Sequence, residues 1–71
     1  MCLATVYLDR NGRREEVMRD VAWIEPEGSG FLLISFLGEK RLFASKMKSI
    51  DLLHSAIVLE GEEQDGGDVS A

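Results

Sequence analysis

Three features that stabilise or locate small proteins are scarce or absent in this chain of 71 residues. It has one cysteine, so no disulfide can form within the chain, and such low cysteine use is typical of a reducing compartment. Its start has no basic segment followed by an apolar run, and no later stretch approaches the roughly 20 apolar residues of a membrane-spanning helix. We therefore expect a cytoplasmic protein with no membrane contact.

The small size limits the hydrophobic core. Chains of this length bury only about 60% of the surface that they expose when unfolded, so their stability is marginal. Small domains commonly compensate with disulfides, a metal ion or a partner subunit. With disulfides excluded, a metal or dimerisation remains as the source of extra stability.

Acidic residues are concentrated at the carboxyl end. Residues 60–71 carry five of the thirteen acids and no base, which leaves eight acids and eight bases in residues 1–59. The final segment also has few large apolar side chains, so it cannot bury enough surface to offset the entropy lost on ordering. The sequence therefore predicts a small β-barrel domain over residues 1–59 and a disordered acidic tail over residues 60–71.

Short apolar runs separated by turn residues predict strands. Residues 2–8 alternate with a period of two, and Asn11-Gly12 then suits the positive φ angles of a type I′ hairpin. Residues 14–25 also allow a helix through spacings of three and four, but the hairpin before them favours one long bent strand or two short ones. The other expected elements are strands at 31–36, 40–44, 46–52 and 56–60, a loop at 26–30, a two-residue type II′ turn at Gly38-Glu39 and a turn at 53–55.

Five or six short strands without a convincing helix indicate an all-β fold. So few residues cannot form a two-layer sandwich of ordinary size, but they can form a small antiparallel barrel of the Sm-like or SH3-like kind, in which closure removes exposed edges. The expected core residues are Ala4, Val6, Leu8, Val17, Val21, Ile24, Leu32, Ile34, Phe36, Leu42, Ile50, Ile57 and Leu59.

Catalytic motifs are absent from the sequence. The glycines at 28 and 30 open no helix and lack a downstream Lys-Ser/Thr pair, so they form no phosphate-binding loop. One cysteine and one histidine are weak grounds for a nucleophile and its base. We therefore expect no enzymatic activity. His54 is expected as an exposed polar residue at a turn, and Trp23 and Tyr7 are expected in barrel packing or at a subunit interface.

Cys2 is chemically distinctive because it lies beside the amino terminus. If Met1 is removed, the Cys2 amine and thiolate form a five-membered chelate; if Met1 stays, its amine, the Cys2 amide nitrogen and the thiolate can still chelate. Nickel(II) favours square-planar geometry, which suits thiolate together with strong nitrogen donors. One terminus supplies only two or three donors, so two protomers related by a two-fold axis would complete the set. The alternative is a buried, inert cysteine in the first strand.

Three segments carry a resemblance to a known family. They are Met1-Cys2-Leu3-Ala4 with Val6 and Leu8, the strand and charged turn from Phe31 to Lys40, and Ile50-Asp51-Leu52 followed by Ile57-Val58-Leu59. In these segments residues 1–60 resemble the CooT family of small nickel-binding proteins, which are tied to the maturation of carbon monoxide dehydrogenase. The tail has no part in the resemblance.

The resemblance implies a homodimer of small β-barrels that binds nickel(II) through Cys2. Such a protein is not an enzyme but an accessory protein, similar to a metallochaperone, that holds or delivers the ion, with carbon monoxide dehydrogenase as the expected client. Members of the family have also been labelled RNA-binding proteins from the likeness of the fold, which does not establish function.

Two other functions stay open at this point. A nucleic-acid-binding module would use Arg10, Arg13, Arg14 and Arg41, but a neutral domain with an acidic tail is poorly suited to phosphate contacts. We therefore do not expect a nucleic-acid partner. The other alternative is a plain protein-interaction domain in which Cys2 only packs.

Overall fold

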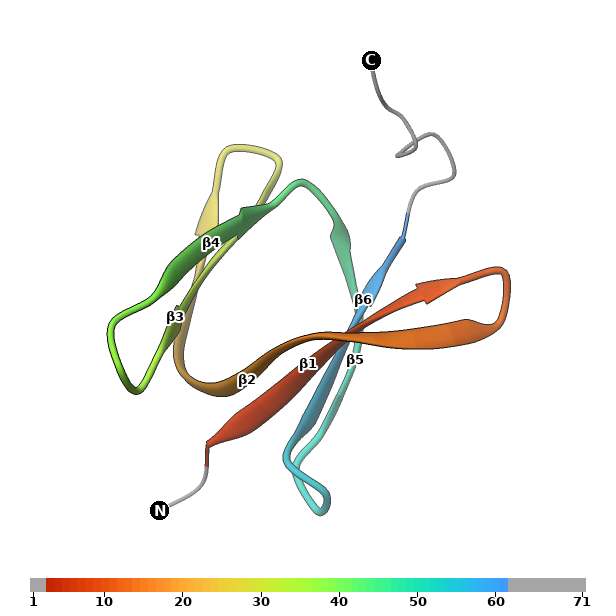
Figure 1. Cartoon of the computed structure of the whole chain (residues 1–71). Coiled ribbons are helices and arrows are strands. Elements are labelled where there is room, and N and C mark those ends of the chain that lie inside the picture. The colour runs from red at the N-terminus through yellow and green to blue at the C-terminus, as the bar shows by residue number, and fades with distance from the viewer. Residues whose placement is uncertain (1–2, 62–71) are drawn as a thin grey trace.

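The computed structural model describes residues 3–61, which form one six-stranded sheet curled into a half-barrel (Figure 1). The described part of the chain contains no helix, and therefore no helix that could cross a membrane. The all-β prediction with five or six strands is confirmed. The strands are β1 (Ala4–Arg10), β2 (Arg13–Glu27), β3 (Gly30–Ser35), β4 (Lys40–Phe43), β5 (Lys46–Asp51) and β6 (Ala56–Glu60).

Two sequence predictions fall wholly or mostly outside the described residues. Cys2 precedes the first of them, and ten of the twelve residues of the expected tail follow the last. The division into a domain at 1–59 and a disordered tail at 60–71 therefore stays a prediction. Glu60 itself ends strand β6.

The strand order is β4-β3-β2-β1-β6-β5. Four neighbouring pairs are antiparallel, but β1 and β6 are parallel, with Thr5 beside Ala56 and Asp9 beside Glu60. The sequence prediction had named antiparallel pairing alone. No ladder joins β4 to β5 in the described residues, so the sheet stays open where a barrel would close.

The parallel pair fixes what lies at each end of the molecule. The start of β1 lies beside the turn that joins β5 to β6, where the Thr5 backbone N–H donates to the Ser55 carbonyl at 2.9 Å. The end of β6 lies beside the β1–β2 hairpin, where the Gly61 N–H donates to the Asp9 carbonyl, also at 2.9 Å.

The first hairpin forms as predicted. Asn11 and Gly12 have φ angles of 52° and 83°, and Arg10 pairs with Arg13 on either side of them. Positive φ at both central residues is the requirement of a type I′ turn, which matches the twist of the flanking strands.

The second hairpin differs from its prediction. The Ser35 N–H donates to the Glu39 carbonyl at 2.8 Å, so the loop has three residues, and Gly38 occupies its last position with a φ of 94°. The Ser35 hydroxyl also accepts hydrogen bonds from the N–H groups of Leu37 and Glu39. The two-residue type II′ turn was therefore wrong, because the glycine supplies the positive φ after the turn rather than at its first central position.

Strand β2 is one long bent strand, as preferred from the sequence. Asp20 has a φ of 51°, and the pairing with β3 shifts register between Val21 and Trp23. A bulge of this kind adds one residue to one strand and bends it. It lets Val21 and Ile24, which are three residues apart, both pack on the core.

The core lies on the inner face of the curled sheet. Its buried apolar residues are Val6, Leu8, Met18, Val21, Leu33, Ile57 and Leu59, with Ala4, Val17, Ile24, Phe31, Phe43 and Met47 packed around them. Val58, on the other face of β6, is also buried.

Strand β3 faces the core with the residues opposite to those expected. Leu33 is 0% exposed, whereas Leu32 and Ile34 are half-buried and Phe36 is 65% exposed. Residues 31–36 are apolar in both alternating sets, so the sequence could not choose between them. Pairing with β2 decides it, because Leu33 lies opposite the inward-facing Ile24. Leu42 and Ile50 are likewise exposed rather than buried.

Candidate functional site

The candidate site lies at the end of the molecule where β1 begins. Leu3, half-buried, is the first residue that the structure describes, and Cys2 is covalently attached to it. The predicted ligand, Cys2, is therefore attached at this end of the molecule. Cys2 itself is not among the described residues. Sequence reasoning placed a chelating cysteine here from its position in the chain alone.

A shallow depression of about 240 Å³ lies beside this chain end. Ala4 of β1 lines it together with residues of β5, of β6 and of the turn between them. The other lining residues are Ile50, Asp51, Leu52, Ser55, Ala56 and Ile57. Apart from Asp51 and Ser55 these side chains are apolar, so the surroundings of the chain start hold few competing polar groups.

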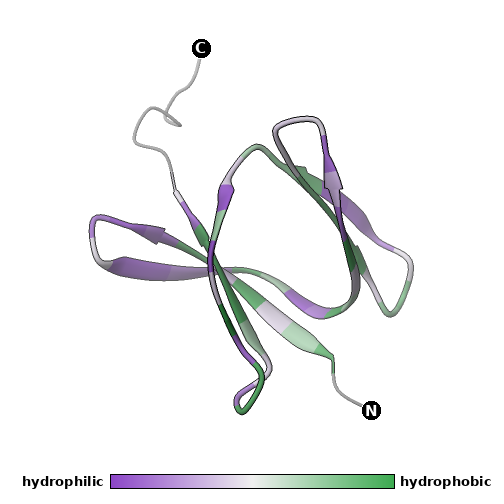
Figure 2. Cartoon of the chain, turned by 180° about the vertical axis from the view of Figure 1, so that it is seen from behind, coloured by the Kyte–Doolittle hydropathy of each residue, from purple (hydrophilic) through white to green (hydrophobic). Residues whose placement is uncertain are grey.

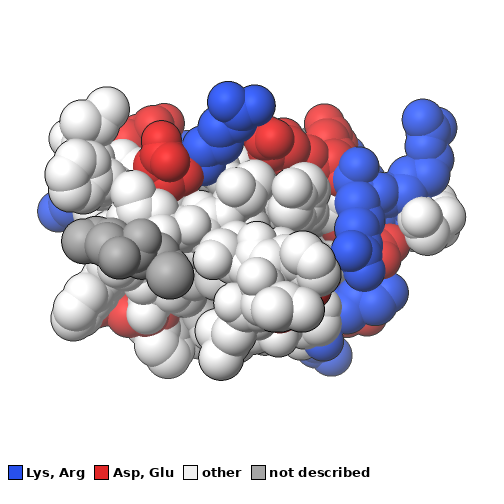
Figure 3. Space-filling model, turned by 90° about the horizontal axis from the view of Figure 1, so that it is seen from below, with Lys and Arg blue, Asp and Glu red and all other residues white. Residues whose placement is uncertain are grey.

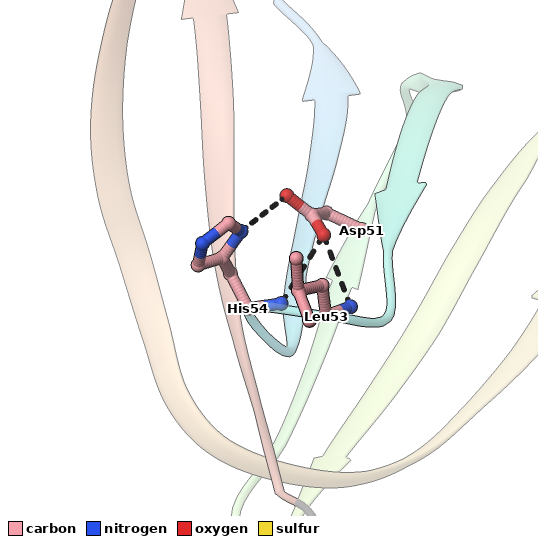
Figure 4. Close-up of polar contacts among 3 residues, drawn as sticks. All are labelled: Asp51, Leu53 and His54. Carbon is pink, nitrogen blue, oxygen red and sulfur yellow. Dashed lines mark hydrogen bonds and ion pairs between the residues drawn. The ribbon is translucent and has the colours of Figure 1, made fainter.

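The β5–β6 turn holds the imidazole of His54 in one orientation (Figure 4). Asp51 Oδ1 accepts hydrogen bonds of 3.1 Å from the N–H groups of Leu53 and His54, and Oδ2 lies 2.9 Å from His54 Nδ1. In the neutral ring this bond favours the proton on Nδ1 and leaves Nε2 as an acceptor. The His54 side chain is 71% exposed, so its prediction as an exposed turn residue is confirmed.

Sequence reasoning missed the partner of His54. The signal was the spacing of Asp51 and His54, which are three residues apart across a predicted turn. An aspartate at this position can accept hydrogen bonds from the backbone of the turn and from the histidine ring. The hydrogen bond from the His54 ring, followed by that from the His54 backbone, holds the pKa of Asp51 below its ordinary value.

The Asp51–His54 contact gives a prediction in acid. Because the pKa of Asp51 is lower in the folded chain, the stability that its carboxylate contributes is complete above the ordinary aspartate pKa and is lost as the pH falls through the lower folded value. We expect His54→Ala to raise the pKa of Asp51 toward the ordinary value, measured by NMR titration of the side-chain carboxyl carbon.

Lys48→Ala is the matched control for this titration. The hydrogen bond from Lys48 is the main cause that lowers the pKa of Asp9, so this variant should raise the pKa of Asp9 and leave that of Asp51 unchanged. An unchanged Asp51 titration in His54→Ala would contradict the assignment of the shift to the imidazole.

The described residues do not form a complete metal site by themselves. Within residues 3–61 no group of three or more histidine, cysteine, aspartate or glutamate side chains is close enough to hold an ion. Asp51 and His54 are only a pair. Any metal held at this end therefore needs donors from the chain start or from another molecule.

Large apolar side chains surround this end of the molecule. Figure 3 shows a broad surface free of charge that is bordered by charged side chains, with most of the lysine and arginine atoms on one side of the view. The tips of the β3–β4 and β5–β6 hairpins contribute Phe36-Leu37 and Leu52-Leu53, and Leu53 is 84% exposed. The other large exposed apolar residues of the described chain are Trp23, Leu42 and Ile50.

These apolar tips were also missed from the sequence. The signal was the occurrence of paired large apolar residues directly at predicted turns, where polar residues are usual. Trp23 is exposed, so it does not pack inside the barrel. The alternative role of Trp23, at a subunit interface, stays a prediction.

The arginines that favoured a nucleic-acid module do not form one surface. Arg41 packs over the Phe43 ring at 5.1 Å and donates to the Val17 carbonyl, so it ties β4 to β2. Arg10 pairs with Glu15 at 3.2 Å in the β1–β2 hairpin. The basic residues are thus divided between a structural contact and one hairpin.

Comparison with known proteins places this fold and its chain start in a family. An uncharacterized protein of Methanocaldococcus jannaschii is 38% identical over 61 residues, which make up 86% of this chain and 100% of the relative. The crystal structure of a protein assigned as CooT from Carboxydothermus hydrogenoformans matches with a TM-score of 0.80 and 26% identity, covering 87% of this chain and all of that chain. Residues 1–60 match the family described as CO dehydrogenase accessory protein CooT. The resemblance read from the sequence is confirmed: this chain belongs to the CooT family of accessory proteins.

Proposed function

We propose that this protein is a cytoplasmic, nickel(II)-binding accessory protein that acts as a homodimer in the maturation of carbon monoxide dehydrogenase. Cys2 of each copy supplies the thiolate ligand, and the ion is cargo that is held and passed on. Family membership supports the accessory role.

The observation that carries the proposal is the uncharged surface around the start of β1 (Figure 3). Of the seven large apolar side chains that are exposed in the described residues, the two hairpin tips contribute Phe36-Leu37 and Leu52-Leu53. Apolar patches of this kind mark interaction sites, and small domains gain stability from a partner subunit. A second copy that packs on this end would bring the two chain starts, and with them both Cys2 residues, to one interface.

The donor chemistry of the chain start fits nickel(II). A thiolate with amine or amide nitrogen matches the square-planar preference of the ion, and two chain starts supply the four donors that one cannot. Binding needs a deprotonated thiol and amine, whose ordinary pKa values are about 8.5 and 7.7–8.0. Nickel affinity should therefore fall as the pH is lowered, because protons compete with the ion for both donors.

Cys2→Ser tests the proposal, with His54→Ala as the matched control. We expect wild type to bind one nickel per two chains, measured by calorimetry and by light scattering, with a charge-transfer band between thiolate and nickel. Cys2→Ser should remain a folded dimer and lose at least tenfold in affinity and the whole band, while His54→Ala should keep both.

Three outcomes would contradict the proposal. Equal binding by wild type and Cys2→Ser would move the ion away from the chain start. A monomer with full nickel affinity would remove the need for a second copy. A dimer that binds no nickel under conditions where the thiol is deprotonated would leave the protein-interaction alternative.

A further inference from the structure

The end of the molecule opposite the chain start carries a basic hairpin. Arg10, Arg13 and Arg14 lie at the tip of the β1–β2 hairpin and line an open hollow of about 540 Å³ together with Asn11 and Glu15. We call this group of three arginines the arginine hairpin. Figure 2 shows the β1–β2 hairpin as a hydrophilic projection from the sheet.

Positive charge on the arginine hairpin is only partly balanced by the described residues. Arg10 pairs with Glu15, but no carboxylate among residues 3–61 lies within ion-pair distance of Arg13 or Arg14. Asp9 faces Arg14 across the ladder, yet its carboxylate is bound to Lys48 at 3.0 Å. Arg10 and Arg13 are also directly opposite each other, where like charges repel.

The chain leaves the described fold against this hairpin. Because β6 is parallel to β1, it ends at the hairpin side of the sheet (Figure 1). The Gly61 N–H donates to the Asp9 carbonyl, and a Cβ on Gly61 would lie 2.5 Å from Arg10 Cγ. The last described residue is therefore in contact with the arginine hairpin.

The residues that follow Gly61 carry the opposite charge. They include Glu62, Glu63, Asp65 and Asp68 and no base. An extended chain spans about 3.5 Å per residue. Because Gly61 contacts Arg10, Glu62 and Glu63 follow within two residues of that contact. Asp65 and Asp68 follow on enough chain to reach the tip of the hairpin.

We propose that residues 62–71 dock on the arginine hairpin as an intramolecular acidic partner and shield it from other anions. Each exposed ion pair is weak, but the tail is tethered beside its site, so its effective concentration is of the order of millimolar. The contact needs no fixed tail conformation. Because exposed charges are screened within about 3 Å at 1 M salt, the docking should vanish at high ionic strength. This inference does not depend on nickel.

The test uses the full chain with the tail neutralised by the substitutions E62Q, E63Q, D65N and D68N. Backbone amide signals of residues 10–15 should shift relative to wild type at low salt, while those of the β5–β6 turn should not. Affinity for heparin, used as a polyanion probe, should rise about tenfold, as expected when a tethered competitor is removed.

A second pair of proteins separates docking from a general change of net charge. In the R13Q/R14Q background, neutralising the tail should alter neither the hairpin amides nor, by more than about twofold, the heparin affinity. Identical hairpin spectra with the native and the neutralised tail would overturn the proposal. So would the same tenfold gain in the R13Q/R14Q background, because only overall charge would then explain it.

Discussion

Leu33→Ala should remove a large part of the free energy of unfolding of this protein. Leu33 is completely buried in the core, and truncation of a buried leucine to alanine costs about 2–5 kcal/mol. A domain of this size has a total stability of about 3–9 kcal/mol at 0.05–0.15 kcal/mol per residue. Urea denaturation followed by circular dichroism measures the change.

Leu32→Ala is the matched control, because it removes the same atoms one position away. Leu32 is half-buried on the outer face of β3, beside the exposed Leu42. We expect its cost to be about 1 kcal/mol or less. A larger loss in Leu32→Ala than in Leu33→Ala would mean that β3 faces the core with the other set of residues.

Gly30→Ala should be the second strongly destabilising substitution. Gly30 is buried where β3 begins, and an added Cβ would collide with the backbone carbonyl oxygen of Phe43 and lie 2.7 Å from Ala44 Cα. Backbone atoms cannot turn aside as a flexible side chain does, so β4 must move away from β3. We expect a loss of about 3 kcal/mol, the upper range for overpacking.

Gly28→Ala separates this collision from an ordinary glycine effect. A Cβ on Gly28 would meet no atom within 4 Å, but its φ of 61° is unfavourable for alanine, which costs about 1 kcal/mol. Equal losses of stability in Gly30→Ala and Gly28→Ala, compared by thermal denaturation, would show that the close approach of β4 to Gly30 adds nothing to the cost of the substitution.

Strands and the first hairpin could be predicted because their signals are local. Asn11-Gly12 specifies its turn through backbone preference alone, and period-two alternation needs only neighbouring residues. The three-residue loop at Gly38 could not be predicted from the glycine, because the Ser35 hydroxyl and the pairing of Ser35 with Glu39 decide where the turn begins.

The sequence could not predict which strands that are distant along the chain pair with each other, or in which direction. The parallel contact of β1 with β6 joins segments about fifty residues apart, and alternation within each strand is the same for either direction. The inner face of β3 depends on its partner β2 in the same way, since both sets of its residues are apolar.

Apolar exposure explains why part of the core prediction failed. Phe36, Leu42 and Ile50 were expected inside because large apolar side chains are usually buried. In the single chain they are exposed, together with the hairpin tips, so burial within one copy was the wrong assumption. For the site, Cys2 stays a prediction from its position in the chain, whereas the apolar side chains near the start of β1 became visible only in the folded molecule.

The parallel β1–β6 ladder has a practical consequence for how this protein is handled. It places the two ends of the described chain at opposite poles of the molecule, since Leu3 leads into β1 at one pole and Gly61 leaves β6 at the other. An affinity tag or fluorophore fused after residue 71 would thus join the fold through the segment that leaves it at the pole opposite Leu3. A fusion before Met1 would instead convert the free amine into an amide and crowd the pole at which two copies are proposed to meet.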